Sequence, residues 1–387
     1  MDFGLTQEQQ MIVDTVRDFC ESELYPHEDL VERLGEVPRE IADEISDKVR
    51  DMGFYAPNFP EDVGGGGLSH LEFTLLEREL GRPSMALSHY WGRPQNILMA
   101  CQGDQRERWL LPAVRGEKRD ALAMTEPDAG SDVRGMKATA VQQPDGDWVL
   151  NGTKHFISGA SDADFVIVCM ATGEDLTPKG PKKRITCFVV DRGTPGFEIL
   201  PGYQSVSHRG YPNNILTFDG CRLDQSHVLG EVDGGFEVMN EWLYATRLTV
   251  AAFCVGRARR VFDASADWAA TRKQFGQTIG RFQGVSFKLA DMITEIDAAD
   301  QLTLKGAWML DQGLDANREI ASAKLYASEM LARVTDEAIS VHGGLGLMSD
   351  LPIERWWRDA RVERIWDGTS EIQRHIISRD ILRKLGS

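Results

Sequence analysis

The sequence predicts an α+β fold that is mainly α-helical, with an N-terminal helical domain, a middle β-barrel domain and a C-terminal four-helix bundle. Two changes of hydrophobic pattern along the 387 residues indicate this order. Apolar residues recur at helical spacing near both ends, whereas the middle consists of short β-rich runs separated by turn residues. We place the domains at residues 1–119, 120–231 and 232–387.

The N-terminal part shows helical spacing from Thr6 to about Lys118. Its one glycine cluster, Gly64–Gly67, precedes a helical pattern around Leu71. The cluster lacks the Lys-Ser or Lys-Thr pair of a phosphate-binding loop, so we expect a flexible loop there.

The middle part contains four β-rich runs, which are Trp148–Leu150, Phe165–Met170, Ile185–Val190 and Ile215–Phe218. Glycine, proline, asparagine and aspartate separate them, which is typical of a small barrel or sandwich. The polar segment Glu174–Arg184 is expected to be an exposed connection between two strands.

The C-terminal part returns to long helical patterns with short connections, which predicts a helical bundle. The predicted helices are Phe236–Ala270, Phe282–Asp311, Asn317–Val341 and a last helix after Gly368.

Composition excludes several functions. The 60 acidic and 43 basic residues give a net charge of -17, which disfavours a nucleic acid partner. The six cysteines form no close pair and the eight histidines no i, i+4 pair, so neither a disulfide framework nor a metal site is predicted.

No apolar run reaches the roughly 20 residues that cross a bilayer, and the start resembles no signal peptide. We therefore expect a cytoplasmic protein without integral membrane association; a mitochondrial matrix protein that has lost its transit peptide would look the same.

Three separated stretches carry a family resemblance. They are Ala123–Asp132 with Asn151–Lys154 and Phe156–Ser158, then Arg272–Gly276 with Ile279, Phe282 and Gln283, and finally His342–Gly344 together with Trp366–Arg374. In this order they resemble the acyl-CoA dehydrogenase family over nearly the whole chain. The resemblance implies that family's fold, FAD as cofactor, an acyl-CoA substrate and a role in fatty acid metabolism.

The first stretch suits a flavin and its phosphates. A turn rich in glycine and hydroxyls lets N–H and O–H groups approach anionic oxygens, although a plain strand connection closed by Pro127 would look similar. The resemblance places Met124 and Thr125 against the isoalloxazine ring. It also implies phosphate-side contacts from Gly130 and Ser131, and a ring pocket completed by Phe156 and Ser158.

The later stretches imply contacts between subunits. Arg272 and Gln283 are similar to residues that reach the FAD of a neighbouring subunit, which implies a homotetramer. A guanidinium pairs well with pyrophosphate, although Arg272 also fits a solvated helix end. One departure is Ser340, where the family commonly has glutamine. The resemblance assigns further cofactor contacts to Phe275, Gly344, Thr369 and Glu371.

Asp367 is the one candidate for the catalytic base. The family usually has glutamate at this position, and the aspartate is one methylene shorter, where about 1 Å of displacement can cost roughly 100-fold in rate. Other branches carry the base just before the arginine that matches Arg247, but here Thr246 stands there. Asp367 also fits a helix start in which Ser370 is the cap and Gln373 lies three residues on.

The acyl pocket is expected near Trp91, Arg93 and Gln95. Arg93 either meets a carboxylate or polar tail of the substrate or extends to the surface. The stretch His208–Asn214 departs from the common family pattern. The resemblance adds Ser131, Arg247 and Gly368 to the substrate contacts.

The implied reaction is an anti elimination from the α and β carbons, with Asp367 as base and its backbone N–H as a donor to the thioester carbonyl. Electron-transfer flavoprotein is the implied electron acceptor. Two alternatives stay open: a nitroalkane oxidase-like flavin oxidase that needs no coenzyme A, and a binding protein that has lost catalysis.

Overall fold

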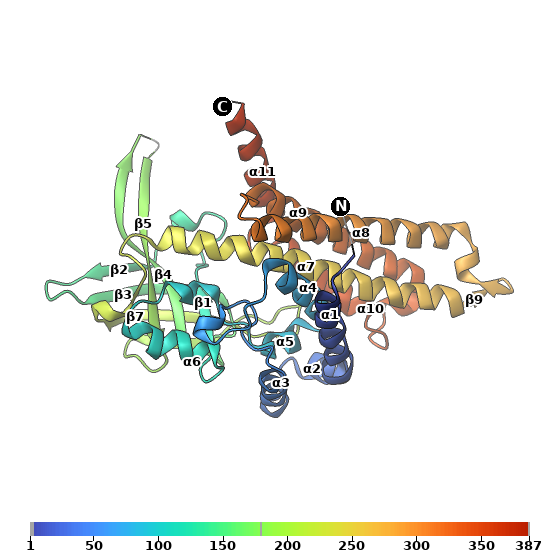
Figure 1. The fold of residues 1–387 in the computed structure, drawn as a ribbon, viewed down its shortest axis with the longest axis horizontal. Coiled ribbons are helices and arrows are strands. Elements are labelled where there is room, and N and C mark those ends of the chain that lie inside the picture. The colour runs from blue at the N-terminus through green and yellow to red at the C-terminus, as the bar shows by residue number, and fades with distance from the viewer. Residues whose placement is uncertain (1–3, 179, 386–387) are drawn as a thin grey trace.

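The computed structural model describes residues 4–178 and 180–385, and it confirms the predicted fold class. The main β-sheet lies at one end of the molecule, and the helices from the two ends of the chain lie together beside it (Figure 1). The longest helix, α7 (Gly235–Thr271), begins beside the sheet and runs the length of the C-terminal bundle (Figure 1). One element therefore connects the sheet to the bundle.

Two of the N-terminal helices, α1 (Gln7–Phe19) and α4 (His70–Leu80), begin at polar caps. Thr6 and Ser69 each form a capping box, with Gln9 and Glu72 respectively, which satisfies amide groups at the two helix starts. The six α-helices are α1 (Gln7–Phe19), α2 (Glu28–Leu34), α3 (Arg39–Asp51), α4 (His70–Leu80), α5 (Met85–Ser88) and α6 (Leu111–Val114).

The predicted loop at the glycine cluster is present, and backbone hydrogen bonds hold it in a defined turn. The amides of Gly65, Gly66 and Gly67 donate to the carbonyls of Pro60, Ala56 and Phe59. A Cβ on Gly65 would lie 2.2 Å from the Phe59 carbonyl oxygen, so only glycine allows this close approach.

The middle domain is one eight-stranded sheet with the path β6-β7-β3-β2-β4-β5-β8, and β1 pairs in parallel with β4. Alternate residues of β4 enter two different core clusters, so both faces of the sheet are buried at this strand. The strands are β1 (Asp120–Ala123), β2 (Thr139–Gln142), β3 (Trp148–Ser158), β4 (Phe165–Thr177), β5 (Gly180–Asp191), β6 (Phe197–Pro201), β7 (Asn213–Leu223) and β8 (Val228–Leu229).

The segment Glu174–Arg184 is not a simple connection, because β4 and β5 stay paired almost to its tip. Glu174 lies opposite Lys183 and Asp175 opposite Lys182, so opposite charges face each other across the hairpin. Lys179, which this prediction also covered, lies outside the described residues.

The C-terminal domain consists of α7, α8 (Gln283–Asp311), α9 (Asn317–His342), α10 (Ile353–Ala360) and α11 (Ser370–Lys384), with a small hairpin of β9 (Lys273–Gln274) and β10 (Gln277–Thr278). Small residues such as Ala251, Ala323 and Ala327 are fully buried in the bundle core, which lets the helices approach closely. Among the described residues, 4–178 and 180–385, no helix is both long enough and apolar enough to span a membrane.

The cap of α11 corrects another prediction. Thr369, not Ser370, is the N-cap, and its hydroxyl accepts from the Ile372 amide. The Ser370 hydroxyl instead donates to Glu329 of α9 at 2.8 Å. The Ser370 side chain, which the local sequence pattern assigned to the cap, thus hydrogen-bonds to a residue of another helix instead.

A buried ion pair fixes the chain after β1. The Lys154 ammonium, on β3, donates to the Glu126 carboxylate at 2.7 Å and to the Met124 carbonyl at 3.0 Å. Glu126 also accepts from the backbone amides of Lys137 and Ala138, and both charged side chains are almost inaccessible to solvent.

We predict that Lys154→Met lowers the free energy of unfolding by about 3–5 kcal/mol, because Glu126 would stay buried without its cation. Denaturant unfolding followed by circular dichroism measures this. The double variant Lys154→Met/Glu126→Gln is expected to lose less, since its amide carries no charge. Equal stability of the single variant and the parent protein would contradict the prediction.

Candidate functional site

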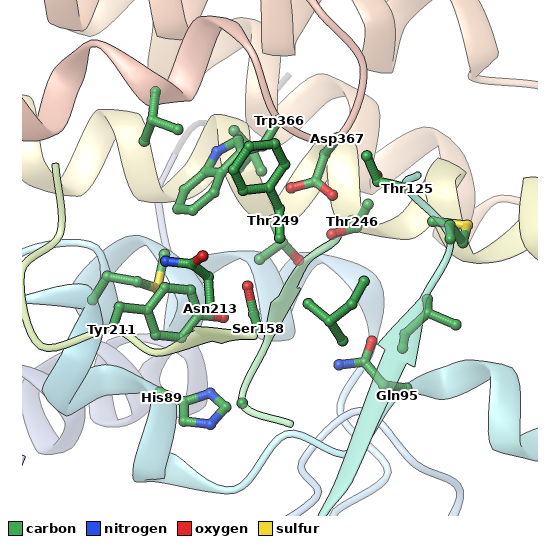
Figure 2. Close-up of a pocket in the computed structure, with 18 of the residues that line it drawn as sticks. His89, Gln95, Thr125, Ser158, Tyr211, Asn213, Thr246, Thr249, Trp366 and Asp367 are labelled. Carbon is green, nitrogen blue, oxygen red and sulfur yellow. The ribbon is translucent and has the colours of Figure 1, made fainter. Parts of the chain in front are cut away.

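A cavity of about 1180 Å³ lies where the three domains meet. Small-molecule sites commonly enclose roughly 300–1,000 Å³, so this cavity has room for a large ligand. Its walls come from the connection after β1, the end of β3, the start of β7, the middle of α7 and the turn before α11 (Figure 2). These segments lie far apart in the sequence.

Most of the predicted site residues line this cavity. Figure 2 shows Thr125, Ser158 and Asp367 directed toward its interior. The full set of predicted residues in the lining is Arg93, Gln95, Met124, Thr125, Gly130, Ser131, Phe156, Ser158, Arg247, Asp367, Gly368 and Thr369.

Trp91 does not line the cavity. Its indole is fully buried, donates to the Phe54 carbonyl at 3.0 Å and packs edge-on against Phe19. This corrects the expectation of a substrate contact, because the side chain is part of the N-terminal core.

Five other predicted residues lie on the surface outside the cavity lining, and they are Arg272, Phe275, Gln283, Gly344 and Glu371. The Phe275 ring is 91 % exposed. A contact between these residues and the cofactor of a second subunit stays a prediction.

Asp367 sits in a turn that points its carboxylate into the cavity, beside Thr246 and Thr249 (Figure 2). The turn contains two successive residues with left-handed backbones, Asp367 at φ 53° and Gly368 at φ 92°. A non-glycine residue in this conformation is strained, so surrounding contacts must hold it.

Burial raises the pKa of Asp367 to about 6. The nearby Lys324 ammonium opposes the shift, the Glu363 carboxylate adds to it, and the Arg247 guanidinium opposes it. A carboxyl group with this pKa is mostly ionised at neutral pH and accepts a proton more readily than an ordinary aspartate.

Lys324 of α9 holds the turn in place. Its fully buried ammonium donates to the carbonyl oxygens of Trp366 at 3.0 Å and Gly368 at 2.8 Å. The Gln373 side chain donates to the same Gly368 oxygen at 2.8 Å. The sequence analysis did not predict a role for Lys324. The pattern that could have indicated one is a lysine on the buried, alanine-rich face of α9, between Ala323 and Ala327.

A second set of buried hydrogen bonds holds Trp366, the residue that precedes Asp367 in the turn. The Trp366 indole donates to one Glu363 oxygen at 2.8 Å, and the other oxygen hydrogen-bonds His208 Nε2 at 3.0 Å. The His208 and Trp366 rings stack at 5.1 Å with 4° between their planes. Burial lowers the pKa of His208, but the Asp359 and Glu363 carboxylates outweigh it, and the net shift is upward.

Arg93 has its charge already compensated. It donates to the fully buried Glu77 carboxylate at 2.6 Å and to the Ser88 carbonyl at 2.9 Å. The side chain therefore neither extends to the surface nor offers an unpaired cation to an acidic tail, which were the two outcomes we expected from the sequence.

One side of the cavity fits FAD by its chemistry. Thr125, Ser131 and Ser158 line it with hydroxyls. A Cβ placed on Gly130 would have no atom within 4 Å, so open space lies next to this residue. Phe156 lines the same cavity with a ring that is 55 % exposed, a surface on which a flat heteroaromatic ring can stack.

Comparison with known families agrees with this chemistry. Three family models match the chain in succession: "Acyl-CoA dehydrogenase, N-terminal domain" at residues 6–117, "middle domain" at 121–221 and "C-terminal domain" at 233–382. Together they cover nearly all of the chain.

Similar proteins match over their full lengths. A probable acyl-CoA dehydrogenase, YngJ, of Bacillus subtilis is 37 % identical, with 99 % of this chain and 100 % of the relative covered. A 3-(aryl)acrylate reductase of Clostridium sporogenes is 34 % identical, with 98 % and 99 % covered. The structure of butyryl-CoA dehydrogenase from Megasphaera elsdenii superimposes with a TM-score of 0.90 at 32 % identity, covering 99 % of this chain and 100 % of that one.

Proposed function

The chain belongs to the acyl-CoA dehydrogenase family, and from this premise we propose that it oxidises an acyl-CoA thioester to the 2-enoyl-CoA. It is an oxidoreductase, and its cofactor is FAD. The observation that carries the proposal is a cavity-facing carboxylate, Asp367, whose pKa is raised to about 6. A general base works best when its pKa lies near the working pH.

In this proposal Asp367 removes the α-proton of the thioester. Its backbone N–H donates to the thioester carbonyl and stabilises the charge that develops there. FAD, when bound, supplies the acceptor for the β-hydride. Met124, Thr125, Ser131, Phe156 and Ser158 are the residues that would hold it.

The shorter side chain of Asp367 makes its backbone position critical. The turn is fixed from both sides, by Lys324 and Gln373 through the Gly368 carbonyl and by Glu363 through Trp366. Because this support leaves the turn little freedom, the carboxylate can be held at the distance that proton transfer requires.

Three further points are proposals that the family suggests. They are electron-transfer flavoprotein as the electron acceptor, a homotetramer in which Arg272 and Gln283 reach a neighbouring subunit's FAD, and a cytoplasmic location. A nitroalkane oxidase activity is the main competitor. Peroxide release with a nitroalkane, together with no flavin reduction by any acyl-CoA, would establish it.

We predict that Asp367→Asn slows acyl-CoA-dependent flavin reduction by at least about 100-fold, because the amide cannot accept the α-proton. Anaerobic stopped-flow spectroscopy with a panel of acyl-CoAs measures the rate. Asp367→Glu is the matched control, since it keeps a carboxylate and is expected to retain more activity. Rapid reduction by the FAD-loaded Asn variant would exclude Asp367 as the base.

We predict that Lys324→Met moves the acid limb of the rate profile to higher pH. The reaction needs ionised Asp367, so the rate falls as the pH drops through the pKa of that group, which is about 6 in the parent protein. Lys324 lowers this pKa, and its removal raises it. The measurement is the flavin reduction rate at saturating substrate between about pH 5 and pH 9.

Glu363→Gln is predicted to shift the same limb the opposite way. The Glu363 carboxylate raises the pKa of Asp367, so neutralising it lowers that pKa and keeps the enzyme active at lower pH. The amide oxygen can still accept from the Trp366 indole. Shifts of the same sign in Lys324→Met and Glu363→Gln would indicate a general structural disturbance rather than electrostatic control.

A further inference from the structure

Polar side chains surround the part of the cavity that lies away from Asp367. Figure 2 shows His89 on the side of the drawn residues away from Asp367, with Ser158 and Tyr211 at intermediate positions and Thr246 and Thr249 beside the carboxylate. All of them belong to the cavity lining. An unbranched hydrocarbon chain has no group that could form hydrogen bonds with these side chains.

His89 offers both kinds of hydrogen bond to a ligand. Within the described residues the structure gives neither ring nitrogen a hydrogen-bond partner, and the ring is held edge-on by Tyr90 and Tyr211, each at 5.2 Å. Burial lowers the pKa of His89 to about 4, so the ring is neutral at physiological pH. A neutral imidazole has one N–H donor and one nitrogen acceptor.

Two further hydroxyls, on α7, line the cavity nearer to Asp367. Buried threonines elsewhere in the described helices, such as Thr303 and Thr335, donate to the carbonyl four residues earlier. The structure gives Thr246 and Thr249 no such bond, and both side chains face the cavity (Figure 2). Their hydroxyls are therefore available to a ligand.

The charges near this end disfavour an acidic substrate. Arg93 already contacts the Glu77 carboxyl group at 2.6 Å, although burial raises the pKa of Glu77. Asp120, a further carboxyl group in the lining, accepts from the Gln95 amide at 3.0 Å, and burial raises its pKa to about 6.

Asp162 also lines the cavity and accepts from the Tyr90 hydroxyl at 2.8 Å, while Arg119, the other guanidinium near His89, pairs with Asp43 at 3.1 Å. A second carboxylate on the acyl group would therefore meet three acids here and only cations that already have an acidic partner.

We propose that the substrate's acyl group is uncharged and carries a hydroxyl group, beyond its β-carbon, that hydrogen-bonds to His89. This inference rests on the proposed dehydrogenase function and specifies its substrate class. A hydroxyl both donates and accepts, which matches a neutral imidazole. A plain alkyl chain would bury the two ring nitrogens of His89 without giving them a hydrogen-bond partner, which costs binding energy.

The test compares acyl-CoAs of equal chain length in the FAD-loaded enzyme. We expect kcat/KM for flavin reduction to be at least about 10-fold higher for an ω-hydroxyacyl-CoA than for the unsubstituted acyl-CoA. We expect the corresponding ω-carboxyacyl-CoA, the mono-CoA thioester of the dicarboxylic acid, to be the poorest of the three. Preference for the unsubstituted or the acidic compound would overturn the inference and leave the dehydrogenase function standing. Failure of all three to reduce the flavin, across several chain lengths, would count against both.

His89→Phe isolates the proposed contact. Phenylalanine keeps a ring between Tyr90 and Tyr211 but has no nitrogen, so the preference for the hydroxylated compound is expected to fall to about 1. His89→Gln retains a donor and an acceptor and is expected to keep part of the preference. His375→Phe, which replaces an exposed histidine of α11 outside the cavity, is the matched control and should leave the ratio unchanged. An undiminished ratio in His89→Phe would show that His89 does not recognise the substrate.

Discussion

The buried ammonium of Lys324 is the interaction on which the site depends. Removing a lysine from water is costly, and here the cost is offset by two backbone carbonyls and a nearby carboxylate. Those carbonyls, of Trp366 and Gly368, flank Asp367 on both sides. One side chain therefore both fixes the strained turn and tempers the pKa of the carboxyl group it presents.

Opposing effects act on the pKa of the Asp367 carboxyl group. Burial and Glu363 favour its protonated form, whereas Lys324 and Arg247 favour the ionised form. Glu363 is itself engaged by Trp366 and by His208, so its position is fixed as firmly as that of Asp367. The balance keeps the pKa close to neutrality without leaving the group exposed to bulk water.

The two ends of the cavity have different chemistry because different domains build them. The sheet contributes hydroxyls and the Phe156 ring at a side suited to a flavin, whereas the N-terminal helices contribute His89 and the Arg93–Glu77 pair. The helix α7 borders both and carries Thr246, Arg247 and Thr249. Its residues thus connect the proposed base with the proposed acyl pocket.

The sequence by itself determined the order of helical, β and helical parts, because hydrophobic periodicity is a local property of each segment. It also singled out Asp367 and the Thr125 and Ser158 segments through their motifs. Only the tertiary structure decided that Trp91 belongs to the core, that Arg93 is paired with Glu77 and that Thr369 caps α11. Lys324 and His208 meet partners 42 to 155 residues away, and no local pattern encodes such contacts, since they arise only when separate elements pack together.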